Sequence, residues 1–357
     1  MINFAVGPVM MNDEVKKLGA QEIPYFRTPE FSELMKENEQ LLLKFFQAPS
    51  NSRCVFLTGS GTAAMEAAVI NSFSKQDKVL IVNGGSFGER FVQICEIYSI
   101  PYAQIKLEYG EPLTASHLLP YENAGFTGFL INLHETSTGV LYDAALVGSF
   151  CRRNGLFLVV DCISAFLADD FNMEAVGANI ALTGSQKALA TPPGVSILVM
   201  DEKAVKRAQE NQNPCLYLNL ADHLKNMERG QTPFTPAVGT LIQMNARLKA
   251  IDRNGVGSEL ARTKALAQDF RKRIQELELS FLTESMSNAV TSVVVGKGIS
   301  TRKIFEVLKD EYGIFICPNG GELGQKVFRV GHIGNLTIED NDKLMKALWD
   351  LKGRGLI

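Results

Sequence analysis

The chain has 357 residues, 46% of them hydrophobic, which is enough for a large core and favours two domains over one. Its formal net charge of −3 offers no basic surface for nucleic acid, and its apolar runs are too short to cross a bilayer. The first residues lack a basic stretch followed by a long apolar run, so no signal peptide is expected.

The six cysteines and four histidines follow no metal-site or disulfide pattern. None of the cysteines forms a CxxC pair, several lie in apolar runs, and the histidines are dispersed. We therefore expect buried free thiols in a reducing compartment, the cytoplasm, and no metal site.

Short apolar runs alternate with helical stretches from residue 54 to residue 200. The runs are rich in Val, Ile and Leu and have no polar alternate face, which is typical of strands buried on both sides in a parallel sheet under helices. They are CVFLTG (54–59), KVLIVN (78–83), GFLINL (128–133), GLFLVVD (155–161), ANIALTG (178–184) and SILVM (196–200).

The last of these strands should run antiparallel to its neighbours. Only eight residues separate Lys187 from Ser196, and they include Pro192, Pro193 and Gly194. A parallel crossover needs about a dozen residues or more, so this connection is too short for one.

A second α/β pattern follows residue 237. Two helical stretches (238–255 and 259–277) lead into SVVVG (292–296), a helix over 300–311, IFIC (314–317), KVFRVG (326–331) and a last helix behind Thr337, with Asp340 close to a capping box. The sequence thus predicts a large domain over 16–245 and a small C-terminal domain over 246–357, with residues 1–15 packing on one or the other.

Small and polar residues follow the carboxyl ends of the predicted strands. Since ligands of such sheets bind beyond these ends, we expect the segments to converge on one cleft. The segments are 59–62, 83–85, 134–137, Asp161 and 185–187.

The stretch TGSGTAAMEAA (58–68) places small residues between a strand and a helix, where free backbone N–H groups bind phosphate well. A tight strand–helix turn without a ligand explains it equally well. It is neither a P-loop, because GK[ST] is missing, nor a dinucleotide fingerprint, because GxGxxG is incomplete.

Three charged residues have both a structural and a functional interpretation. Asp161 ends a strand and is either a helix N-cap or the partner of a cationic ligand group. Lys187 follows the next strand, 26 positions later, and is either a solvated surface group or part of the same site. Arg329 lies in an apolar strand and is either in a structural ion pair or a carboxylate binder.

Taken together, these features describe a pocket for an anionic aromatic aldehyde, pyridoxal 5′-phosphate. The 60–62 turn would hold the phosphate and Asp161 would face a protonated ring nitrogen. Lys187 would form a Schiff base, because burial lowers the pKa of a lysine and makes a neutral amine available. Arg329 would take a substrate carboxylate.

At these residues the chain resembles the class V aminotransferases of pyridoxal-phosphate fold type I. The resemblance covers nearly the whole chain and is greatest for the alanine–glyoxylate, serine–pyruvate and 2-aminoethylphosphonate–pyruvate branch. GSGTAAMEAA, HETSTGV, VVDCIS, GSQKALATPPG and KVFRVG stand in the family's order and spacing.

The resemblance implies a role for each matching residue. Catalysis would rest on Lys187 and Asp161, in an enzyme that moves an amino group from a small donor to pyruvate or glyoxylate. The cofactor would be held by Ser60, Gly61, Thr62, Phe87, Thr136, Asp161, Gln186, Lys187 and, from the second subunit of a homodimer, Thr235, while Arg329 would bind substrate. Thr232 stands where some relatives have a tyrosine, so no role is assigned to it.

Two alternatives remain open at this point. A lyase or desulfurase of the same fold would share the cofactor, with Cys317 as the only cysteine near the Arg329 segment, although IFIC favours a strand residue there. An NAD-binding oxidoreductase would suit the parallel sheet but leaves Lys187 unexplained. Neither alternative involves nucleic acid or a membrane.

Overall fold

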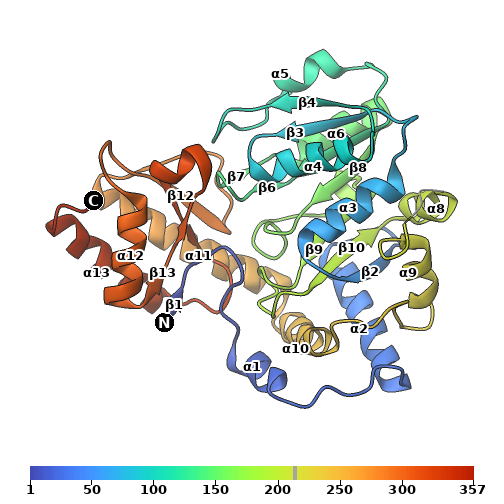
Figure 1. The fold of residues 1–357 in the computed structure, drawn as a ribbon, viewed down its shortest axis with the longest axis horizontal. Coiled ribbons are helices and arrows are strands. Elements are labelled where there is room, and N and C mark those ends of the chain that lie inside the picture. Colours follow the sequence, from blue (N-terminus) through green and yellow to red (C-terminus); the bar gives the residue numbers. More distant parts are fainter. Residues whose placement is uncertain (212–214) are drawn as a thin grey trace.

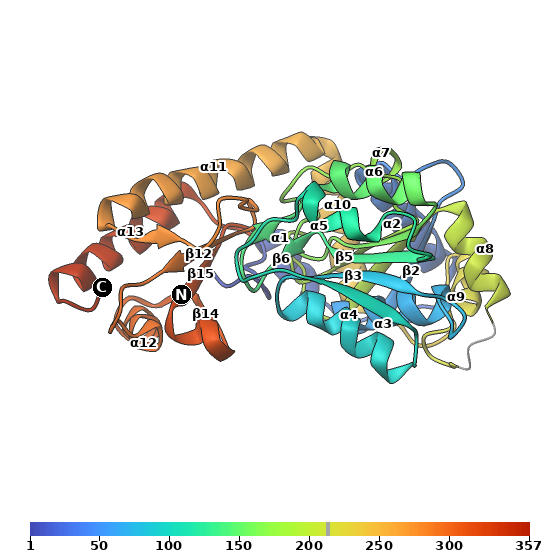
Figure 2. The same ribbon diagram turned by 90° about the horizontal axis from the view of Figure 1, so that it is seen from above.

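The computed structural model describes residues 1–211 and 215–357, which form a larger lobe around a central sheet and a smaller C-terminal lobe (Figure 1). Helix α11 (Val256–Ile274) extends from beside the larger lobe over the smaller one (Figure 2). The division predicted between residues 245 and 246 falls inside α10 (Val238–Asn254), and the domain boundary stays a prediction. No helix within the described ranges is long and apolar enough to span a membrane.

The larger lobe is built on a sheet that has seven strands among the described residues. In spatial order these are β2 (Arg53–Thr58), β10 (Val195–Met200), β9 (Ile180–Gly184), β8 (Phe157–Asp161), β5 (Gly128–Asn132), β3 (Val79–Asn83) and β4 (Tyr102–Lys106). Strand β10 is antiparallel to both neighbours and the other pairs are parallel, so the predicted antiparallel strand is confirmed. Strand β4, at the edge, has one buried residue among its five and was not predicted.

Helices cover both faces of this sheet, which explains why its central strands are apolar on both sides. One face packs against α3 (Gly61–Ser72), α4 (Ser86–Ile97), α8 (Glu202–Glu210) and α9 (Leu220–Met227). The other packs against α2 (Pro29–Phe45), α6 (Ala144–Asn154), α7 (Met173–Val176) and α10. Of the short helices, α1 (Asp13–Gly19) packs on α10, and α5 (Ala115–Leu118) adds Leu118 to the second of these apolar clusters.

The smaller lobe carries a four-stranded sheet in the order β11 (Ser280–Phe281), β12 (Val290–Val294), β15 (Val327–Gly331), β14 (Cys317–Pro318), counted over the described chain. Helices α11, α12 (Thr301–Tyr312) and α13 (Ile338–Gly353) pack on it. The predicted capping box between Thr337 and Asp340 is present at the start of α13. The IFIC run divides into β13 (Ile314–Phe315) and β14, and β1 (Ile2–Asn3) pairs in parallel with β13.

Candidate active site

Eight of the predicted site residues line one cavity of about 210 Å³ at the carboxyl ends of the sheet strands. They are Ser60, Gly61, Thr62, Phe87, Thr136, Asp161, Gln186 and Lys187. Five further residues complete the lining: Met65, Arg90, His134, Ile163 and Ser164. Of these, His134 lies in the predicted 134–137 segment, although no role was assigned to it. Not every strand-end segment converges here, because Asn83 and Gly85 line a separate hollow.

The turn before α3 presents an uncapped helix N-terminus to this cavity. Ser60 is the N-cap residue, but its side chain makes no capping hydrogen bond. A side chain at Gly61 would come within 2.3 Å of Ile163 Cδ1, so only glycine leaves the approach to the backbone open. The Thr62 hydroxyl accepts a hydrogen bond from Arg90 Nη1 at 3.1 Å. Free N–H groups at such a helix start favour an anion.

Lys187 reaches the cavity from the loop that follows β9. Its Nζ donates to the Val6 carbonyl at 2.7 Å, and a Cβ at Gly7 would lie 3.0 Å from the same nitrogen. Burial of the amine, followed by the nearby Arg329 charge, lowers the pKa of Lys187 to about 8. A neutral amine is therefore accessible near physiological pH, as a nucleophile requires.

Asp161 ends β8 with 5% of its surface exposed. Its Oδ1 accepts from the Ile163 N–H at 2.7 Å, the one hydrogen bond to this carboxylate found within the described residues. Burial foremost, and the Glu135 carboxylate in addition, raise the pKa of Asp161 to about 7. A cationic ligand group beside Asp161 would offset this penalty on the charged form.

The remaining wall contains a buried hydroxyl pair and a buried imidazole. The Thr136 and Ser164 hydroxyls are 2.6 Å apart. His134 is 2% exposed, and burial, followed by the Lys187 charge, lowers its pKa to about 3, so the ring is neutral. The Ser164 backbone has a smaller, opposite effect on that pKa, yet neither ring nitrogen reaches hydrogen-bond geometry with any described residue.

Arg329 lines a neighbouring hollow of about 350 Å³, which shares Phe87 with the first cavity. Its Nη1 donates to the Thr136 carbonyl at 2.9 Å, and its Nη2 contacts Cys317 Sγ at 3.2 Å and the Pro318 carbonyl at 3.3 Å. Within residues 1–211 and 215–357, no carboxylate lies within salt-bridge distance of Arg329. The interpretation of Arg329 as one half of a structural ion pair therefore has no partner residue in this part of the chain. Its role in binding a substrate carboxylate stays a prediction.

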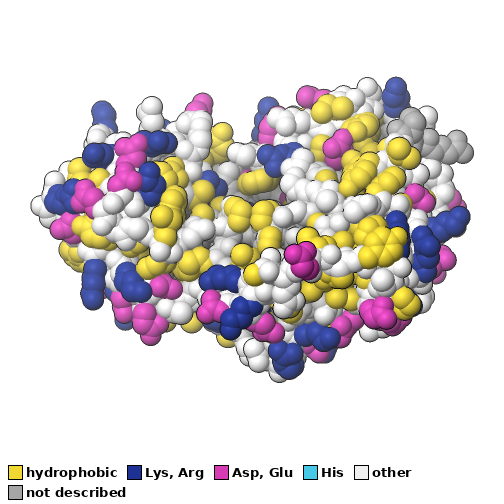
Figure 3. Space-filling view, turned by 60° about the horizontal axis from the view of Figure 1, so that its bottom comes forward, with side chains coloured by type: hydrophobic (Ala, Val, Ile, Leu, Met, Phe, Trp, Pro, Cys, Tyr) yellow, Lys and Arg dark blue, Asp and Glu magenta, His cyan; other side chains and the backbone are white. Residues whose placement is uncertain are grey.

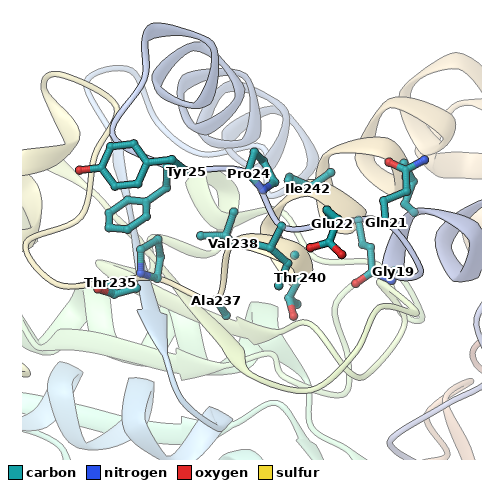
Figure 4. Close-up of a pocket in the computed structure, with 16 residues that line it drawn as sticks. Gly19, Gln21, Glu22, Pro24, Tyr25, Thr235, Ala237, Val238, Thr240 and Ile242 are labelled. Atoms are coloured by element: carbon teal, nitrogen blue, oxygen red, sulfur yellow. The ribbon is translucent and has the colours of Figure 1, made fainter.

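Thr235 lies away from the cavity formed by its own chain. It is exposed, at the edge of an open hollow of about 930 Å³ that segments 18–26 and 235–243 line from opposite sides (Figure 4). Thr232 is buried and donates its hydroxyl to the Phe234 carbonyl at 2.7 Å. Within one chain, the structure therefore does not bring Thr235 to Lys187.

Comparison with known proteins identifies the family. A profile of the class V aminotransferases matches residues 24–330. An uncharacterised aminotransferase of Methanocaldococcus jannaschii is 31% identical over 92% of this chain and 86% of its own length, and an L-aspartate–glyoxylate aminotransferase of Paracoccus denitrificans is 28% identical over 94% and 86%. The solved alanine–glyoxylate aminotransferase of Nostoc sp. superposes with a TM-score of 0.91 at 27% identity, covering 98% of this chain and 94% of the other.

The chain belongs to the class V aminotransferase family and has its fold type I architecture. It is an aminotransferase, and the predicted family, fold and enzyme class are confirmed. This membership favours transamination over the NAD-binding alternative.

Proposed function

We propose that the protein uses pyridoxal 5′-phosphate to move an amino group from a small amino donor of the alanine, serine or 2-aminoethylphosphonate type to glyoxylate or pyruvate. One observation carries the proposal: Lys187, Asp161 and the Ser60–Thr62 turn surround a single cavity.

The residues present fit this cofactor. The uncapped start of α3 suits its phosphate, and the side-chain amide of Gln186, which lines the same cavity, could donate to it from Nε2. Asp161 suits the protonated ring nitrogen, because a cation beside it would favour its charged form. Phe87 and Ile163 add apolar surface for an aromatic ring.

When bound, pyridoxal phosphate supplies an aldehyde that exchanges amino groups and a ring that accepts electrons. Asp161 would hold the proton on the ring nitrogen. Lys187 Nζ, with its lowered pKa, would bond to the aldehyde carbon at rest and carry a proton from the substrate α-carbon during turnover. The Val6 carbonyl, 2.7 Å from Nζ, would orient this amine.

Arg329 would fix the substrate through its carboxylate. Its guanidinium is already held by the Thr136 and Pro318 carbonyls, so the side chain loses less conformational freedom when a planar carboxylate binds. Glyoxylate is the acceptor that the names of the Paracoccus and Nostoc relatives share, which supports a small 2-oxo acid in this hollow.

A substrate panel tests this proposal. Alanine, serine, aspartate and 2-aminoethylphosphonate would each be paired with glyoxylate and pyruvate, with product amino acids quantified. We expect glycine from glyoxylate with a small α-amino acid donor. Absence of any amino transfer, or cysteine-dependent sulfide release in its place, would contradict the proposal.

We also propose a homodimer in the cytoplasm, with Thr235 completing the phosphate site of the second copy. The exposed apolar residues Ile23 and Tyr25, at 66% and 70%, border the hollow that contains Thr235. Hydrophobic side chains are exposed over much of one face of the molecule, interspersed with charged ones (Figure 3). A patch of this kind supports a protein interface, and four buried free cysteines support a reducing compartment.

Sedimentation of the native protein and of Tyr25→Glu would test the dimer. We expect a native dimer and a monomeric variant with weakened cofactor binding. A monomer with full activity at the same concentration would contradict it.

A further inference from the structure

Arg90 is a cation in the cavity wall that the proposed function does not use. It lies on α4, one turn after Phe87, and its guanidinium carbon is 5.0 Å from the centroid of the Phe87 ring. No carboxylate approaches it within salt-bridge distance in the described parts of the chain. Arg90 is half-buried, lines the cavity, and has a small lowering effect on the pKa of Asp161. A guanidinium that faces a pocket without a close carboxylate can pair with a bound anion.

The contacts of Arg90 place its charge beside the turn before α3. Nη1 donates to Thr62 Oγ1 at 3.1 Å, and Thr62 is in the first turn of α3. The guanidinium is therefore hydrogen-bonded to the turn whose free N–H groups favour an anion.

We infer that Arg90 is a cofactor-binding residue that recognises the phosphate of pyridoxal 5′-phosphate, directly or through the Thr62 hydroxyl that it orients. This inference rests on the proposed function. An arginine can add a charge-assisted hydrogen bond to a phosphate oxygen, which the neutral turn cannot supply. Because the Arg90 guanidinium already stacks on the Phe87 ring, the side chain loses less conformational freedom when it binds a phosphate.

The alternative is that Arg90 only supports the fold by joining α3 to α4. The two roles differ in one measurable respect. A phosphate contact affects pyridoxal phosphate and leaves pyridoxal, which has the same ring and aldehyde but no phosphate, unaffected. A structural role affects both ligands equally.

The test compares dissociation constants of pyridoxal phosphate and pyridoxal for cofactor-free native protein, Arg90→Gln and Arg90→Lys, measured by visible absorbance. We expect Arg90→Gln to weaken pyridoxal phosphate binding about tenfold or more and pyridoxal by less than about twofold. Arg90→Lys should lie between, since it keeps the charge without the planar fork. Arg302→Gln, an exposed arginine on α12 paired with Glu306, is the matched control and should match native protein.

Equal weakening of both ligands, or no weakening of either, would overturn the inference. If Arg90→Gln does not fold, as judged by its thermal unfolding, Arg90→Lys decides on the same criterion. A native protein that binds neither ligand would contradict the proposed function itself, so the two failures are distinguishable.

Discussion

The two hollows that meet at Phe87 hold their charged groups in different ways. In the first, Lys187 and Asp161 are buried with few partners, and both pKa values are moved toward neutral pH, to about 8 and about 7. In the second, Arg329 is fixed by two backbone carbonyls and a thiol. The charge state of the two buried groups therefore depends on pH and on what lies beside them, whereas the position of the Arg329 guanidinium is set by its backbone contacts.

Replacing Lys187 should have the largest effect of any change in the first hollow. Lys187→Ala removes the only amine expected to bond the cofactor, so turnover should fall by at least about 10³-fold. The protein should remain folded, because the substitution removes an amine whose burial is unfavourable for its charged form. Steady-state kinetics and thermal unfolding would measure this, and retention of more than a tenth of native activity would remove Lys187 from the site.

Asp161 should rank second. Asp161→Ala and Asp161→Asn both lose the charge that keeps a ring nitrogen protonated, and kcat should fall about 10²-fold or more in each. Cofactor affinity should change much less, because the phosphate contacts remain. If Asp161→Asn were as active as native protein, the carboxylate would be only a cap for the Ile163 N–H.

Replacing Arg329 should impair use of the substrate and leave the cofactor unaffected. Arg329→Ala and Arg329→Lys should lower kcat/KM for an α-amino acid donor about 10-fold to 100-fold, since the forked, charge-assisted contact is lost or reduced to a point charge. The visible cofactor spectrum should be unchanged. Normal KM and kcat in both variants would show that the carboxylate is bound elsewhere, for instance near Gly7 or at Arg27.

The smallest expected effect is a pH dependence of cofactor attachment. Because the pKa of Lys187 is lowered to about 8, its neutral fraction should increase about tenfold between pH 7 and pH 9. The rate at which the visible band appears after cofactor is added should increase with it and then level off. A small free amine under the same conditions is the control, and a midpoint near the ordinary lysine value of 10.5 would contradict the burial of Lys187.

The part of the site that follows from local chain order was predictable. Strands buried on both faces have a continuous apolar signal, and Asp161 and Lys187 come at the ends of adjacent strands β8 and β9. Edge strand β4 was not predicted because only one of its five residues is fully buried, so it lacks a continuous apolar run.

Residues that reach the site only through tertiary packing could not be predicted in this way. Arg90 has no distinctive spacing, and the Val6 carbonyl contacts Lys187 from 181 positions away. Arg329 comes close to Phe87 only because the smaller lobe packs beside the larger one. The expected position of Thr235 depends on a second chain, and the only sequence evidence for that chain is the family resemblance.

The central claim is that Lys187 bonds the cofactor, and the most direct measurement is borohydride reduction of the protein with pyridoxal phosphate, followed by proteolysis and mass spectrometry. Reduction makes the carbon–nitrogen bond permanent, so the modified lysine can be identified. The account predicts a phosphopyridoxyl group on Lys187 in nearly all of the protein. Stoichiometric labelling of a different lysine, or no labelling under conditions where a visible band is present, would contradict it.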